Sequence, residues 1–145
     1  MPTTRRARTL AASPEALWET VGDPHHLPRW WPRVARVEAV EAGRFTAALA
    51  TDRGRTVRAD FVVVASEAPV VRAWEQELAG TPFERVLAAA RTEVRLGVDA
   101  AGTRVTLELR QRLRGMSQLG GFMLRRANRR LLDEALDALE GLHGA

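Results

Sequence analysis

The sequence predicts an α+β domain in which a curved antiparallel sheet of about seven strands wraps around a long C-terminal helix. Three observations support this fold class. A tryptophan-rich helical segment lies near the start of the chain, strand-like segments then follow one another as far as residue 113, and an amphipathic helix is predicted from about Ser117 to Leu142. At 145 residues the chain has the size of one domain, so we expect a single core over residues 1–145.

The first strand is predicted over Thr3 to Leu10, and two short helices are predicted directly after it. Ser13-Pro14 is a helix start, because serine accepts hydrogen bonds from free amides and proline has its φ angle preset for the first helical position. Asp23-Pro24 repeats this signal for a shorter helix ahead of Trp30-Trp31. We expect one of these adjacent tryptophans to close the end of the sheet and the other to pack on the helix or line a pocket mouth.

Alternating apolar and polar residues predict six further strands. They cover Val34 to Glu41, Arg44 to Ala50, Arg55 to Ala65, Val70 to Leu78, Arg85 to Val98, and Val105 to Leu113. In the fifth of these, the predicted inward row is Val86, Ala88, Ala90, Thr92, Val94, Leu96 and Val98. The last two strands exceed the usual five or six residues. Long antiparallel strands with one apolar face must curl around another element, and the C-terminal helix is the candidate.

An apolar stripe runs along the predicted C-terminal helix. Its members are Leu119, Met123, Ala127, Leu131, Ala135, Leu139 and Leu142, flanked by Phe122, Leu124, Leu132 and Leu136. Each glycine of Gly120-Gly121 would lower helix stability by about 1 kcal/mol relative to alanine. The start of the helix would then be loose and could act as a gate over a cavity. In the alternative, the helix begins after Gly121. Arginines at 125, 126, 129 and 130 form a solvated face paired with Asp133 and Glu134, and a weak contact with an anionic membrane is an open alternative.

The composition excludes several function classes. The chain has no cysteine, tyrosine or lysine, which excludes thiolate, phenol and Schiff-base chemistry. The three histidines are His25, His26 and His143. Apart from Asp23, no acidic residue or cysteine lies near His25 and His26 at a spacing that would complete a zinc site, so we expect no metal and no cofactor. The net charge is only +4, and no aromatic residues are interleaved with the arginine clusters, so we expect no nucleic-acid partner.

The sequence also contains no apolar window long enough to span a membrane and no signal-peptide core at its start. We therefore expect a cytoplasmic protein, a monomer or a homodimer, whose membrane contact is at most peripheral.

Several local motifs resemble the START-like, or SRPBCC, superfamily, in particular its polyketide cyclase/dehydrase-like branch. The motifs are the proline-started helix with Trp18, Asp23-Pro24, Leu27-Pro28-Arg29-Trp30-Trp31-Pro32, Gly102 to Thr106 in the last hairpin, and Arg114-Gly115. The resemblance implies the helix-grip fold, with a deep cavity between the curved sheet and the C-terminal helix. Different members use this cavity for hydrophobic ligands, for lipids or for aromatising a polyketide chain, so the resemblance does not imply one activity.

Eight residues are candidates for ligand contact in such a cavity: Phe45, Phe61, Arg72, Trp74, Thr92, Gln111, Phe122 and Met123. Trp74 and Arg72 share one strand face and would offer a stacking surface and a cation; in the alternative, the opposite face with Val71 points inward. Thr92 and Gln111 are polar members of apolar rows. Each either binds a ligand or satisfies a backbone group or a water molecule.

The favoured hypothesis is the binding or carriage of a hydrophobic or aromatic small molecule, lipid-like or polyketide-like, because a catalytic constellation is missing. The catalytic residues, if there are any, stay unknown. One alternative is a polyketide cyclase or dehydratase in which Arg72, or a carboxylate such as Glu75 or Glu84, assists proton transfer. Another alternative is a partner module that docks a protein through its open sheet or its arginine-rich helix.

Overall fold

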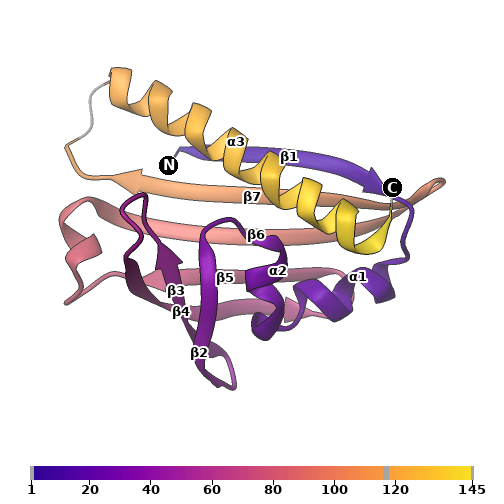
Figure 1. Ribbon diagram of the computed structural model, residues 1–145. Helices are drawn as coiled ribbons and strands as arrows, with labels where there is room; N and C mark the ends of the chain where they lie inside the picture. The colour runs from indigo at the N-terminus through magenta and orange to yellow at the C-terminus, as the bar shows by residue number, and fades with distance from the viewer. Residues whose placement is uncertain (1, 116–117, 145) are drawn as a thin grey trace.

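The computed structural model describes residues 2–115 and 118–144, and it has the predicted order of elements (Figure 1). The strands are β1 (Thr3–Leu10), β2 (Val34–Glu41), β3 (Arg44–Ala50), β4 (Thr56–Glu67), β5 (Val71–Glu77), β6 (Leu87–Asp99) and β7 (Gly102–Leu113). The helices are α1 (Pro14–Val21), α2 (Leu27–Trp30), α3 (Gln118–His143) and the short 3-10 helices η1 (Pro24–His26) and η2 (Pro82–Arg85). The α+β class and the seven-stranded antiparallel sheet are therefore confirmed.

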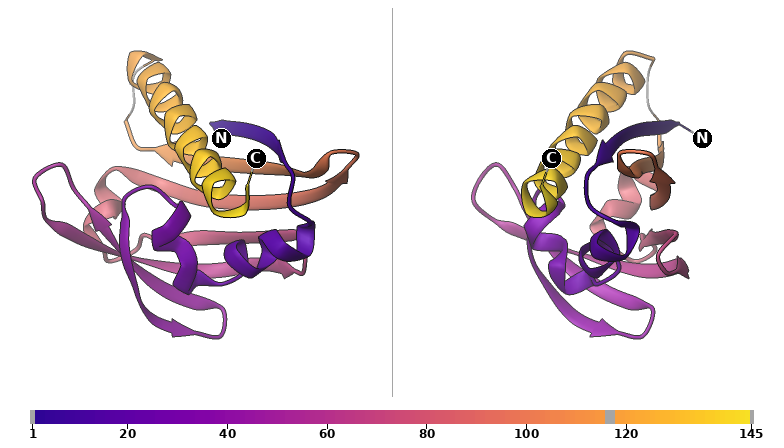
Figure 2. Two further views of the ribbon diagram at one scale, coloured as in Figure 1. Left: turned by 45° about the vertical axis from the view of Figure 1, so that its right-hand side comes forward. Right: turned by 90° about the vertical axis from the view of Figure 1, so that its right-hand side faces the viewer.

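The strands form one sheet in the order β1-β7-β6-β5-β4-β3-β2, and every neighbouring pair is antiparallel. The first strand of the chain thus lies beside the last strand, at one edge. Figure 2 shows the sheet curling, with α3 lying across its concave side. The helices α1 and α2 lie at one end of this concave side, where the chain crosses from β1 to β2 (Figure 1).

Helix caps fix the position of these short helices. The Ser13 hydroxyl accepts a hydrogen bond from the Ala16 amide at 3.2 Å, and the Asp23 carboxylate accepts one from the His25 amide at 3.0 Å. Both helices have proline in their first turn, as the sequence predicts. Gly102 has a φ of 139° and lies so close to the Leu10 carbonyl that a side chain would collide with it, so this turn requires glycine.

The buried face of α3 coincides with the predicted stripe and its flanks only in the second half of the helix. Its buried residues are Asn128, Leu132, Ala135, Leu136 and Leu139. Met123, a member of the predicted stripe, is 62% exposed. A row of residues at steps of four overshoots one helical turn by about 40° at each step, so the predicted row winds off the buried side. The helix also includes Gly120 and Gly121, so the alternative start after Gly121 is wrong.

Ion pairs between β1 and α3 fix the two elements side by side. Arg6 lies 3.2 Å from Asp133, and Arg8 lies 2.7 Å from Asp137. Asp133 therefore pairs with β1, whereas the sequence suggested a partner within the helix. Both pairs are substantially exposed and contribute little stability individually. They nevertheless set the register of α3, whose first turns extend beyond the start of β1 (Figure 1).

The inward row predicted for β6 is correct in its middle and wrong at its ends. Thr92, Val94 and Leu96 are buried, but the register of β6 shifts between Leu87 and Ala89. A bulge of this kind reverses which residues face inward, so Leu87 is buried in place of Val86.

On the outer face, Glu108 of β7 is only 4% exposed although it carries a charge. Its carboxylate accepts hydrogen bonds from Arg5 of β1 at 2.6 Å and from Arg110 at 2.5 Å. Burial by itself raises the pKa of Glu108, but these hydrogen bonds and the two positive charges outweigh it and hold the pKa below its ordinary value. This ion-pair cluster joins the edge strand β1 to β7.

Replacing Glu108 with glutamine is expected to lower the free energy of unfolding at neutral pH by about 1–2 kcal/mol, since the charge-assisted bonds are lost but their guanidinium groups are partly solvated. Because the folded pKa is depressed, this contribution is present above the unfolded pKa. It disappears as the pH falls through the folded pKa. Urea denaturation at several pH values measures the difference. In the control Glu75→Gln, an exposed carboxylate 3.5 Å from Arg91 is lost, and an equal effect there would refute the prediction.

Replacing Leu132 with alanine is expected to cost about 2–5 kcal/mol, because its fully buried side chain anchors α3 on the sheet. The matched control is Leu142→Ala, which truncates a half-exposed leucine of the same helix and should cost less than about 1 kcal/mol. Both values come from urea denaturation followed by circular dichroism. Equal costs would mean that the second half of α3 is not the anchor.

Candidate ligand-binding site

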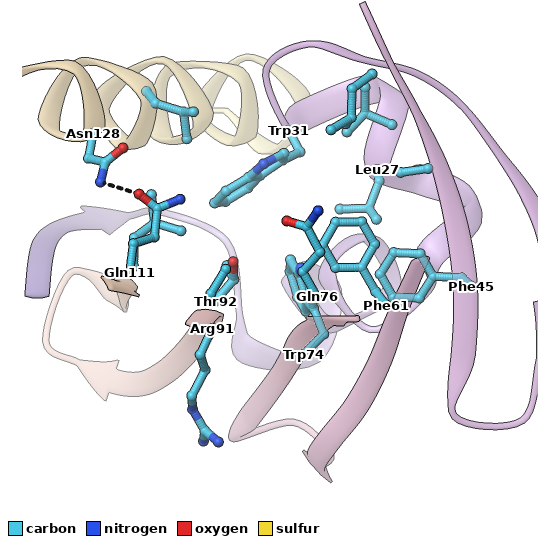
Figure 3. A pocket seen from close by; sticks show the side chains of 16 residues that line it. Leu27, Trp31, Phe45, Phe61, Trp74, Gln76, Arg91, Thr92, Gln111 and Asn128 are labelled. Carbon is cyan, nitrogen blue, oxygen red and sulfur yellow. Dashed lines mark hydrogen bonds between the residues drawn. The ribbon is translucent and has the colours of Figure 1, made fainter. Parts of the chain in front are cut away.

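A cavity of about 150 Å³ lies between the concave face of the sheet and α3 (Figure 3). Strands β2 to β7 all contribute to its walls, α2 and the residue after it close one side, and α3 covers it. The lining residues are Leu27, Trp31, Val34, Phe45, Ala47, Leu49, Phe61, Trp74, Gln76, Ala90, Arg91, Thr92, Leu109, Gln111, Asn128 and Leu131. Most of these side chains are apolar, and the polar ones come from only four elements.

A continuous series of aromatic contacts forms one wall of the cavity. Trp31 meets Trp74 edge to face with ring centroids 6.0 Å apart, and Trp74 meets Phe45 in the same way at 6.2 Å. Phe45 is stacked on Phe61 at 5.2 Å. Trp30 lies behind Trp31 in the core, with ring centroids 5.3 Å apart. Trp31 lines the cavity, as expected of one of the two tryptophans. These contacts fix ring orientations that a flexible aliphatic wall would not hold.

The strand alternation of β5 decides how Trp74 and Arg72 are placed. Trp74 is 5% exposed and lines the cavity, so the inward orientation of its face is confirmed. Arg72 lies two residues away, about 7 Å along the strand, and is not among the lining residues. Its guanidinium donates a hydrogen bond to the Ser66 hydroxyl at 3.0 Å. Burial lowers the pKa of Arg72, and the charge of Asp23 partly opposes this shift.

Four uncharged polar side chains reach the cavity: Gln76, Thr92, Gln111 and Asn128. The Asn128 amide donates a hydrogen bond to the Gln111 side-chain oxygen at 2.9 Å, which joins α3 to β7 across the cavity (Figure 3). The side-chain partner of Gln111 is therefore another side chain, and not the backbone group or water considered from the sequence. Thr92 is buried, and its hydroxyl makes no hydrogen bond with the described residues.

Gln76 is the polar group with the greatest need of a partner. Its amide nitrogen is buried and has no hydrogen-bond acceptor among the described residues. In Figure 3 this amide points into the cavity, between Trp31 and Phe61. A buried amide without a partner costs about 1–3 kcal/mol, so such a group calls for an explanation.

Five of the eight candidates from the sequence line the cavity together: Phe45, Phe61, Trp74, Thr92 and Gln111. Phe122 and Met123 do not line it, because they lie on the first turns of α3, whose side chains at these positions are more than half exposed. Gln76 and Asn128 were missed. The alternation that places Trp74 inward also indicates Gln76, whereas Asn128 becomes visible only when the buried side of α3 is known.

Charged groups are nearly absent from the cavity. Arg91 is the one ionisable residue among the described lining residues, and its guanidinium lies 3.5 Å from both Glu75 and Glu93. Figure 3 shows Arg91 directed away from the cavity. Glu75 and Glu84, the carboxylates considered for proton transfer, are not lining residues. The described residues contain no group of three acidic, histidine or cysteine side chains that could hold a metal ion.

Within the described part of the chain, no helix is both long enough and apolar enough to cross a membrane.

Comparison with known proteins identifies the family. The family model described as polyketide cyclase / dehydrase and lipid transport matches residues 1–143. No curated protein gives a significant match. Among solved structures, the START superfamily protein from Mycobacterium smegmatis is 14% identical with a TM-score of 0.76, covering 97% of this chain and 96% of that chain. XoxI from Bacillus cereus is 18% identical with a TM-score of 0.75, covering 99% and 96%.

The di-domain ARO/CYC protein StfQ of the steffimycin biosynthetic pathway is also similar. It is 14% identical with a TM-score of 0.77, and the match covers 97% of this chain and 50% of StfQ. Identities this low show a common fold and nothing further, whereas the family model matches nearly the entire chain. The chain therefore belongs to the polyketide cyclase / dehydrase and lipid transport family, with the START-like helix-grip fold.

Proposed function

We propose that the protein binds a small aromatic molecule that carries a hydrogen-bond acceptor, in the cavity between the sheet and α3. The observation that carries this proposal is the unpartnered Gln76 amide inside an aromatic-walled cavity. Ligand sites in proteins typically combine such apolar walls with a few polar groups that orient the ligand. The match to a family that includes lipid transport agrees with a binding role.

The volume of the cavity limits the size of the ligand. A cavity of about 150 Å³ accommodates roughly one benzene-sized molecule. Sites for larger ligands usually have volumes of about 300–1,000 Å³. A single substituted ring is therefore the ligand that fits without repacking. A longer lipid-like or polyketide-like chain would require the first half of α3 to move away from the sheet.

The ring of the ligand would extend the aromatic series formed by Trp31, Trp74 and Phe45. Each favourable aromatic pair contributes about 0.5–1.5 kcal/mol beyond the burial of its area. Edge-to-face partners on one side and the stacked Phe45–Phe61 pair on the other select a flat molecule. Saturated chains would bury similar area without these contacts.

The acceptor of the ligand would accept a hydrogen bond from the Gln76 amide N–H, which otherwise has no acceptor among the described residues. A carbonyl oxygen fits best, because none of the described lining residues directs a cation into the cavity to balance a carboxylate (Figure 3). The Thr92 hydroxyl offers a second donor or acceptor on β6, the strand beside β5. Together they would fix the orientation of the ring as well as its affinity.

The second candidate is a cyclase or dehydratase, which the family description and the similarity to StfQ favour. Without a carboxylate or imidazole among the described lining residues, catalysis here would act by holding a reactive chain in a folded shape. Binding requires no such group, and we therefore favour it.

A matched pair of probes, acetophenone and ethylbenzene, tests the proposed acceptor. In Gln76→Leu, acetophenone is expected to bind about tenfold more weakly, because about 1.4 kcal/mol of hydrogen bonding is lost. Ethylbenzene, which has no acceptor, should bind the variant at least as well as the wild-type protein. Quenching of tryptophan fluorescence measures both affinities, since Trp31 and Trp74 line the cavity.

The control is Thr46→Val, which removes a hydroxyl that faces Asp60 at 2.6 Å and does not line the cavity. It should leave both affinities unchanged, whereas Thr92→Val should weaken acetophenone alone. Equal losses for both probes in Gln76→Leu would show that the variant disturbs packing only. If neither probe binds the wild-type protein, the one-ring ligand class is wrong.

A further inference from the structure

The first half of α3 carries a surface that the cavity does not use. We propose that this surface docks the protein on an anionic lipid bilayer. It consists of Phe122 and Met123 together with Arg125, Arg126, Arg129 and Arg130, and we call it the α3 patch. The proposal goes beyond ligand binding and does not depend on it, because docking concerns the outside of the helix.

The apolar part of the α3 patch consists of two adjacent large side chains that are more than half exposed. Phe122 is 52% exposed and Met123 is 62% exposed, and they are adjacent in sequence. Both belong to the first two turns of α3, the end of the helix that extends past the start of β1 in Figure 1. Large exposed apolar side chains surrounded by polar ones are typical of an interaction site.

The charged part of the α3 patch is uncompensated. All four arginines are exposed, and none makes a hydrogen bond or ion pair with the described residues. Residues 118–132 contain these four arginines and no aspartate or glutamate, so the segment carries a charge of about +4 at neutral pH. The acidic residues of α3 begin at Asp133, which pairs with Arg6 on β1. The positive charge of the first half is therefore available to an anionic surface.

Helical spacing places five of the six side chains of the α3 patch on one side of the helix. Phe122, Arg126 and Arg129 are separated by four and then three residues, and so they lie in one row. Met123 and Arg130 are seven residues apart and lie in the neighbouring row. The buried residues Asn128 and Leu132 lie about a quarter to a third of a turn away from the row of Phe122, toward the cavity and the sheet. Arg125, seven residues before Leu132, lies at the border between the two sides. A flat surface could thus contact the α3 patch without disturbing the core.

A bilayer fits this combination better than other anionic partners. Amphipathic interfacial helices have aromatic or aliphatic side chains that enter the headgroup region, together with arginines that reach the phosphates. The surface is one convex helix without a groove, so it offers a folded partner little area. Single-stranded nucleic acids would need several stacking rings, and Phe122 is the only aromatic residue of α3.

The test is co-sedimentation of the intact protein with vesicles of phosphatidylcholine alone or with about one third phosphatidylglycerol. We expect binding to the anionic vesicles only, weakened by added salt. Replacing all four arginines with glutamine should lower the partition coefficient at least about 100-fold, since each cation near an anionic surface contributes about a factor of five. Replacing Phe122 and Met123 with serine should lower it about tenfold.

Two controls separate docking from a change in net charge or in folding. Glutamines at Arg29, Arg53, Arg55 and Arg104, which are exposed elsewhere, remove the same charge and should change binding only a few-fold. Lysines at the four positions of the α3 patch should retain binding, because charge and not guanidinium geometry is required. Circular dichroism and acetophenone affinity should be unchanged in every variant, so failure of docking remains distinguishable from failure of the proposed ligand site.

Any of three results would overturn the proposal. The first is equal binding to neutral and anionic vesicles, and the second is an equal loss in the two arginine-to-glutamine sets. The third is an absence of vesicle binding by the wild-type protein at low salt. An acidic protein that binds the α3 patch in place of vesicles would fall under the third result.

Discussion

The packing of the second half of α3 on the concave sheet is the constraint on which the rest of the structure depends. Leu132, Leu136 and Leu139 are almost fully buried there, and the ion pairs with β1 hold the helix in register. The first half of the helix packs less deeply: Phe122 and Met123 are more than half exposed, and Asn128 faces the cavity. The cavity and the exposed surface of the first half both follow from this difference in packing between the two halves of α3.

The cavity contains polar side chains where a protein core normally has apolar ones. A core position next to Trp74 would normally hold an apolar side chain, yet Gln76 and Thr92 place polar groups there without partners in the described protein. Proteins tend to break such local rules at functional sites and to compensate elsewhere. Here the compensation comes from the leucines of α3 and from the aromatic contacts around Trp74.

Most of the fold could be predicted because interactions between residues close in sequence determine it. The predictions were wrong where contacts between distant elements determine which side chains are buried. Ser13, Asp23 and the prolines after them fix helix starts by contacts within a few residues, so the sequence alone locates them. The buried side of α3 depends instead on how the helix lies on the sheet, and that orientation decides whether Asn128 or Met123 faces inward. Alternation placed Glu108 on the outer face but did not indicate the covering arginines from β1 and β7.

The pairing of β1 with β7 has a consequence for folding during synthesis. Arg5 and Glu108 are 103 residues apart in sequence, so β1 has no neighbour in the sheet until β7 has been synthesised. Contacts this distant in sequence form late and slow the folding of a chain. The backbone hydrogen-bonding groups of β1 therefore stay unpaired during synthesis. The strand becomes ordered only when the β6–β7 hairpin has formed.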